Sequence, residues 1–159
     1  MMTLVKFRSP IFIAVSFSFT LAACTGIADD QLARGGQTLA MVPANHTDRY
    51  AVHIFIDKYW AGDVSAQAGG TKAACCFPGR KDWSKPISVT WEWGREEDAE
   101  TKAITMPAEK HSAVVNFPAH GPHQDPNWRK SDAYLCVIFR DLNTVALAFS
   151  PSGAECLTK

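Results

Sequence analysis

The chain has 159 residues and equal numbers of basic and acidic side chains, 16 of each, so its formal net charge is zero. No basic run or patch is visible, and this excludes a nucleic-acid partner recognised through its phosphate backbone. The length allows one small domain and not two.

The first 23 residues predict a lipoprotein signal peptide. Lys6 and Arg8 precede an apolar run, Ile11–Ala23, that is shorter than the roughly 20 residues needed to cross a bilayer. The run ends in Leu-Ala-Ala and Cys24, which resembles the bacterial lipobox. By this resemblance we expect cleavage before Cys24, which would become the mature N-terminus and carry more than one acyl chain, palmitate among them, as a membrane anchor.

The residues after the predicted anchor indicate where the protein is held. Thr25, which stands where an aspartate would direct retention, favours the outer membrane by resemblance to enterobacterial sorting, with the domain facing the periplasm. Residues 24–44 are small and polar and contain Gly35-Gly36, which predicts a flexible tether, although Leu39–Val42 also has the apolar character of a first strand. Residues 45–159 are then a single β-rich lipoprotein domain.

Two segments alternate with the period of a half-buried strand. In Tyr50–Asp57, the side chains of Val52, Ile54 and Ile56 share one face. In Pro86–Trp93, an apolar face alternates with a polar one, and both tryptophans are expected in the core. The apolar face of this second segment consists of Ile87, Val89, Trp91 and Trp93.

Three later segments complete the predicted strands. Ser112–Phe117 is one, and Ala133–Arg140 is apolar on both faces, as a central strand would be. Thr144–Ser150 follows a short polar break, which predicts a hairpin. The charged stretch Arg95–Ala103 is interpreted as a solvated loop rather than a helical turn. With no long amphipathic helix, the sequence predicts an all-β fold, a small antiparallel β-sandwich or open barrel.

The five cysteines suggest disulfides. Lipidation of Cys24 leaves Cys75, Cys76, Cys136 and Cys156, which can pair in the oxidising periplasm in three ways. Because successive side chains of a strand point to opposite faces, we favour one bridge from each of the adjacent cysteines to Cys136 and Cys156. A vicinal bridge between Cys75 and Cys76, or one bridge with two free thiols, remains possible.

Motifs for catalysis and cofactor binding are missing from the sequence. It contains no nucleophile elbow, zincin, phosphate-loop or dinucleotide-binding pattern. His120, His123 and Asp125 could hold a metal ion, but a Pro- and Gly-rich loop with incidental histidines explains them better. We therefore expect no enzyme activity, no cofactor and no metal site.

Four residues are candidates for contact with a protein partner. Trp60, Trp83 and Trp128 lie beside turn signals, and Arg80 lies close to Trp83. Exposed tryptophan near arginine is typical of binding anchors. Packing at the edge of the core is the alternative for each tryptophan.

Three segments together resemble the domain of unknown function 3304 family of short bacterial lipoproteins. They are Asn45–Asp57, which begins Asn-His-Thr, Gly69–Trp83, with its glycine pair and paired cysteines, and Lys85–Trp93, with a Val-x-Trp strand. Residues 80–82 depart from the family pattern and leave the shape of that loop open.

The resemblance implies a function. Some lipoproteins similar to these are encoded beside type VI secretion phospholipase effectors and act as immunity proteins that bind the toxin in the periplasm. We therefore expect a membrane-anchored lipoprotein that binds and neutralises a secreted phospholipase effector. The alternative is a structural or accessory cell-envelope lipoprotein with no toxin partner.

Overall fold

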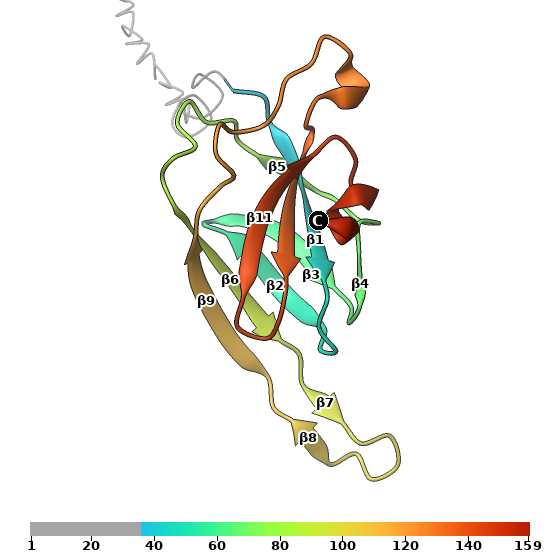
Figure 1. Ribbon diagram of the computed structural model, residues 1–159. Coiled ribbons are helices and arrows are strands. Elements are labelled where there is room, and N and C mark those ends of the chain that lie inside the picture. The colour runs from blue at the N-terminus through green and yellow to red at the C-terminus, as the bar shows by residue number, and fades with distance from the viewer. Residues whose placement is uncertain (1–35) are drawn as a thin grey trace, which may run out of the picture.

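The computed structural model describes residues 36–159, which form two β-sheets packed face to face (Figure 1). The predicted signal peptide, Cys24 and most of the predicted tether lie outside these residues. The first sheet has the order β11-β10-β1-β4, with β5 also paired to β1, and the second has the order β3-β2-β6-β9. The first sheet comprises β1 (Leu39–Asn45), β4 (Ala68–Gly69), β5 (Ala74–Phe77), β10 (Tyr134–Phe139) and β11 (Val145–Ser150). The second comprises β2 (Ala51–Ile56), β3 (Tyr59–Val64), β6 (Ile87–Trp93) and β9 (Glu109–Val115).

Three smaller features complete the described chain. Strands β7 (Glu96–Glu97) and β8 (Ile104–Met106) form a separate two-stranded hairpin. Two short 3-10 helices are η1 (Trp128–Lys130) and η2 (Ala154–Thr158). No helix among residues 36–159 is long and apolar enough to span a membrane.

The main core lies between the two sheets and confirms the predicted all-β sandwich. Its fully buried side chains come from both layers, so neither sheet could hide its apolar face alone. The prediction that all strands pair in antiparallel fashion needs one correction, because β1 and β10 run parallel. The largest fully buried side chains of this core are Leu39, Met41, Ile54, Ile56, Phe77, Val89, Trp93, Leu135, Val137 and Phe139.

A second, smaller core covers the outer face of the first sheet and explains why β10 is apolar on both faces. Val42 and Ile138 are buried there beneath η2. The same core contains a disulfide between Cys136 of β10 and Cys156 of η2, with their Cα atoms 5.3 Å apart. Both sheets, both cores and this bridge are built from residues 36–159.

The predicted tether is too long at its C-terminal end. Residues 39–44 belong to β1, which lies at the centre of the first sheet between β10 and the β4 and β5 segments. Their apolar side chains determine this, because Leu39, Met41 and Val42 are at most 1% exposed. The domain therefore begins before residue 45.

The alternation in β6 is confirmed, with Val89, Trp91 and Trp93 buried. The alternation predicted for β2 is wrong in its first half, where Ala51 rather than Val52 is buried. A break in the pairing with β3 and β6 lies at His53, which has a φ of 50° and donates its N–H to the Asp63 carboxylate at 2.7 Å. This bulge reverses the face to which the preceding residues point.

Candidate functional site

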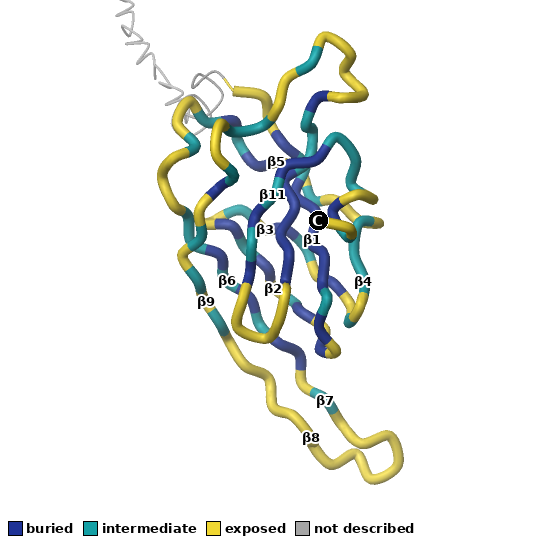
Figure 2. The backbone as a smooth tube through the Cα atoms, in the orientation of Figure 1, coloured by how far each residue is buried: buried dark blue, intermediate teal, exposed yellow. Residues whose placement is uncertain are grey.

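The hairpin formed by β7 and β8 projects from one end of the sandwich, and we call residues 95–108 the arm (Figures 1 and 2). Nearly all of its residues are exposed, including two large apolar side chains, Ile104 at 57% and Met106 at 37%. Its charged residues give an acidic excess and are Arg95, Glu96, Glu97, Asp98, Glu100 and Lys102. The arm therefore presents apolar and acidic groups to solvent and contributes nothing to either core. The solvated loop predicted for 95–103 is thus partly a strand pair.

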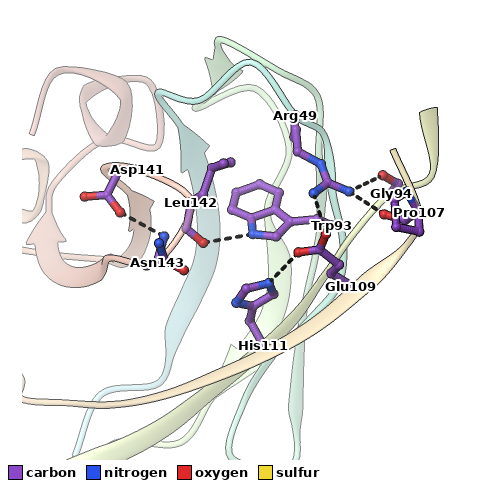
Figure 3. Close-up of polar contacts among 9 residues, drawn as sticks. All are labelled: Arg49, Trp93, Gly94, Pro107, Glu109, His111, Asp141, Leu142 and Asn143. Atoms are coloured by element: carbon purple, nitrogen blue, oxygen red, sulfur yellow. Dashed lines mark hydrogen bonds and ion pairs between the residues drawn. The ribbon is translucent and has the colours of Figure 1, made fainter. Parts of the chain in front are cut away.

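A buried arginine holds the base of the arm. Arg49 is 4% exposed, and its Nη2 donates to the carbonyl oxygens of Gly94 at 2.9 Å and Pro107 at 2.7 Å (Figure 3). Gly94 precedes β7 and Pro107 follows β8, so one guanidinium joins the two chains where they leave the sandwich. Its Nη1 also lies 3.5 Å from Glu109 Oε1. The planar, multiply donating guanidinium suits this arrangement better than a lysine would.

The Asn-His-Thr segment positions Arg49. The buried Asn45 side chain donates to the carbonyl of Arg49 at 2.6 Å and accepts from the N–H of Thr47 at 2.9 Å and its hydroxyl at 2.8 Å. These bonds close a tight turn in which the Arg49 side chain points toward the arm. The Asn-His-Thr motif at the start of Asn45–Asp57 is therefore part of the structure that supports the arm.

Tyr50 forms a second contact with the base of the arm. Its hydroxyl donates to the carbonyl of Arg95 at 2.9 Å, and its ring lies against Gly94. A Cβ atom at position 94 would overlap that ring, so the close approach requires glycine there.

Aromatic side chains extend this network into the core. The His111 ring stacks on Trp91 with centroids 5.3 Å apart, and its Nε2 lies 3.4 Å from Glu109 Oε2. Trp93 Nε1 donates to the carbonyl of Leu142 at 2.9 Å (Figure 3). In the described chain, Arg49 Nε and Trp91 Nε1 are buried without a hydrogen-bond partner. The contacts of Arg49, Glu109 and His111 therefore connect the base of the arm to the core of the sandwich.

Sequence reasoning missed this site. An arginine in a turn after a strand is normally solvated, and nothing in the sequence indicates that Arg49 is buried. The alternation at Ile104 and Met106 is the one local signal for β8, and it is too short to predict a strand.

The cysteine pairing favoured from the sequence is wrong. The structure joins Cys75 to Cys76 and Cys136 to Cys156. The alternation argument fails because the ladder between β5 and β1 shifts register between its two paired positions, and both Cys75 and Cys76 are exposed. Cys136 instead points to the outer face of the first sheet, where η2 brings Cys156 to it.

The four residues predicted for partner contact lie apart from the arm and differ in exposure. Trp60 is 51% exposed on β3 and Trp128 is 75% exposed on η1. Trp83 is half-buried and packs edge-on against Phe117 and Phe149, at the border of the core. Arg80 is half-buried, with its guanidinium 5.1 Å from the centre of the Phe117 ring.

The loop histidines do not form a metal cluster. His123 Nε2 lies 3.8 Å from Asp125 Oδ2, while the backbone N–H of His123 is bonded to Asp132 at 2.7 Å. Within residues 36–159, no three His, Cys, Asp or Glu side chains are placed to share a metal ion.

The larger open cavities recorded for residues 36–159 lie on the sandwich, away from the arm. The larger, about 520 Å³, is lined by Tyr59, Arg80, Lys81 and Lys85 among others, and we call it the Arg80 cavity. The smaller, about 400 Å³, lies between Trp60 and residues 72–74.

Asp98 organises the tip of the arm and predicts an effect of pH. Its Oδ1 accepts from the N–H of Thr101 at 2.7 Å, its hydroxyl at 2.8 Å and the N–H of Glu100 at 3.1 Å. These bonds, with Thr101 first, hold the pKa of the carboxyl below the usual 3.8. The order they give the tip is present above 3.8 and is lost as the pH falls through the lowered pKa.

A pH titration followed by carbon NMR should show the Asp98 carboxyl titrating below 3.8. Hydrogen exchange at the Thr101 amide should accelerate several-fold, relative to its intrinsic rate, over the same range. In Asp98→Asn the amide oxygen still accepts these bonds but does not titrate, so the tip should show no such acid-induced opening. Identical acid behaviour in the two proteins would refute this assignment.

Comparison with known families gives one result. A family model described as protein of unknown function (DUF3304) matches residues 44–135, more than half of the chain. The matched range contains the Arg49 network, the vicinal cysteines and the arm. No curated protein and no solved structure matches the chain significantly.

Proposed function

The chain belongs to the DUF3304 family of proteins of unknown function, and from that premise we propose that it is a lipid-anchored envelope protein whose arm binds a protein partner. The partner we propose is a phospholipase effector of a type VI secretion system, which the protein neutralises in the periplasm. The proposal combines the lipobox-like N-terminus, the disulfide-bonded sandwich and the resemblance to lipoproteins encoded beside such effectors.

The arm is the observation that carries the proposal. A hairpin that contributes no residue to either core adds little stability to the fold, yet a buried arginine holds its base. Burying a guanidinium is unfavourable unless its hydrogen bonds are made. An element held this firmly but exposed along its length is suited to contact another molecule.

The chemistry of the arm indicates how it would bind. Ile104 and Met106 can enter an apolar cleft, such as one that accepts acyl chains, and the acidic side chains around them would pair with basic groups at its rim.

The test is protection from a phospholipase effector encoded in the same genome and directed to the periplasm. Cells that also produce this protein should survive, and the two purified proteins should bind. Ile104→Asp with Met106→Asp should weaken binding about 30-fold, as expected when a contact worth about 2 kcal/mol is lost. Isothermal titration calorimetry measures the change.

Val114→Asp is the matched control. Val114 is 74% exposed on β9 and lies outside the arm, so its substitution should leave protection and affinity unchanged. Full protection by the double arm variant would show that the arm is not the binding element. Unchanged killing in the presence of the wild-type protein would refute the immunity function for that effector.

A further inference from the structure

Gly36 shows where the N-terminal segment meets the domain. A Cβ atom at this position would lie 2.8 Å from the backbone nitrogen of Arg80 and 2.9 Å from Gly79, so the chain enters in direct contact with the loop between β5 and β6. Eleven residues lie between the predicted anchor, Cys24, and Gly36, so the two Cα atoms can be at most about 40 Å apart. A lipid on Cys24 therefore keeps this end of the sandwich, which we call the entry end, near the membrane surface.

Basic side chains gather at the entry end. Arg80, Lys81 and Lys85 line the Arg80 cavity directly beside the entry point. Arg129 and Lys130 of η1 are exposed in a neighbouring loop. That loop returns to the start of β1 through a hydrogen bond from Ala40 N to Ala133 O at 3.0 Å, and Figure 1 shows it at the same end as the β5–β6 loop.

Acidic residues are also present there, and three of them are hydrogen-bonded within their own loops. Asp57 and Asp82 line the cavity, and Asp82 accepts from the N–H of Ser84 at 2.9 Å and its hydroxyl at 2.6 Å. Asp125 and Asp132 accept backbone N–H groups of their own loop at 2.7 Å. The longer side chains of the exposed basic residues extend further into solvent and would meet an approaching surface first; these residues are Lys81, Lys85, Arg129 and Lys130.

Trp128 adds the side chain type that membrane interfaces favour. It is 75% exposed, and the guanidinium of Arg129 lies 5.3 Å from the centre of its ring. Tryptophan concentrates at the headgroup level of bilayers, and neighbouring basic residues are attracted to anionic lipids. An exposed Trp-Arg-Lys turn on a membrane-anchored protein fits that environment.

The opposite end of the molecule carries the opposite charge. Strand β6 begins with Ile87 at the Arg80 cavity and ends with Trp93 next to the base of the arm, a span of roughly 20 Å. The arm has an acidic excess, so an anionic surface would repel it and attract the entry end. The charge distribution would therefore orient the domain.

We propose that the entry end docks on anionic phospholipid headgroups through Arg80, Lys81, Lys85 and the Trp128–Lys130 turn, and so directs the arm away from the membrane. The inference rests on the proposed lipid anchor and adds a second, electrostatic contact. It assigns Arg80 and Trp128 to the membrane rather than to the protein partner. Half-buried Trp83 supports the loop of Arg80.

Lysine labelling of the full chain in vesicles tests the proposal. The protein is reconstituted into phosphatidylcholine vesicles with or without an equal amount of phosphatidylglycerol, treated with an amine-reactive reagent and analysed by mass spectrometry. Labelling of Lys81, Lys85 and Lys130 should fall about fivefold in the anionic vesicles, the factor expected for about 1 kcal/mol per basic residue. Lys102 and Lys110, in and beside the arm, should label equally in both, and high salt should restore labelling at the entry end.

Matched variants complete the test. Lys81→Gln with Lys85→Gln should abolish most of the protection at Lys130, whereas Lys102→Gln with Lys110→Gln should leave it intact. Equal labelling at the two ends in anionic vesicles would overturn the proposal. Protection that is the same in both vesicle types would also overturn it, because the anchor alone would then explain it. Acylation of Cys24 and survival of cells exposed to the phospholipase are measured separately. Failure of the proposed function can therefore be distinguished from failure of the membrane docking proposed here.

Discussion

Arg49→Met is expected to lower the free energy of unfolding by about 2–4 kcal/mol. The substitution keeps the apolar stem but removes the donors that serve the carbonyls of Gly94 and Pro107. Each partly buried acceptor left without a donor costs about 1–3 kcal/mol. The ion pair with Glu109 contributes less, because that carboxylate is 47% exposed and screened by solvent.

Urea unfolding and amide hydrogen exchange measure the two parts of this effect. The unfolding midpoint should fall, and the amides of β7 and β8 should lose protection more than those of β6. Glu109→Gln is the control, since it removes the charge and keeps both carbonyl bonds, and it should cost under about 1 kcal/mol. An Arg49→Met protein with the wild-type midpoint would mean that the arm does not depend on this arginine.

Replacing Cys136 and Cys156 with alanine is expected to destabilise the domain by about 3 kcal/mol. The bridge closes a loop with a sequence separation of 20, and its removal enlarges the set of conformations open to the unfolded chain. Both sulfurs are also buried in the second core, so η2 should detach from β10.

The vicinal pair supplies the matched control for this prediction. Cys75→Ala with Cys76→Ala removes a bridge between adjacent, exposed residues, which closes no chain loop. Its unfolding midpoint should stay close to that of the wild type, and proteolysis near the C-terminus should accelerate only when Cys136 and Cys156 are replaced. Equal destabilisation by the two double variants would contradict the assignment of the stabilising bridge.

The pattern of polar and apolar residues within single segments predicts the strands and the turn that depend on residues close together in the sequence. The alternation of β6 and the two apolar faces of β10 both follow from burial by the adjacent layers. The hairpin between β10 and β11 was also predicted, and Asn143 N indeed bonds to Asp141 Oδ1 across the turn at 2.8 Å.

The features that sequence reasoning missed depend on contacts between distant residues. Nothing local reveals that β1 lies beside β10, or that Arg49 reaches carbonyls 45 and 58 residues away. The bulge at His53 shifts a pattern that is otherwise regular, and the register shift in β5 undermines the cysteine argument. The candidate site is built from such contacts, so the sequence of residues 95–103 by itself predicts a loop.

The parallel pairing of β1 with β10 has a consequence for how the protein matures. In the proposed export, β1 would be the first strand of the domain to cross the inner membrane, and its neighbour β10 would be the second-to-last. Such high contact order slows folding and leaves early strands unpaired for longer. We therefore expect β1 to lack its β10 partner until nearly the whole chain is available, and folding to depend on chaperones until then, which in the proposed export are those of the periplasm.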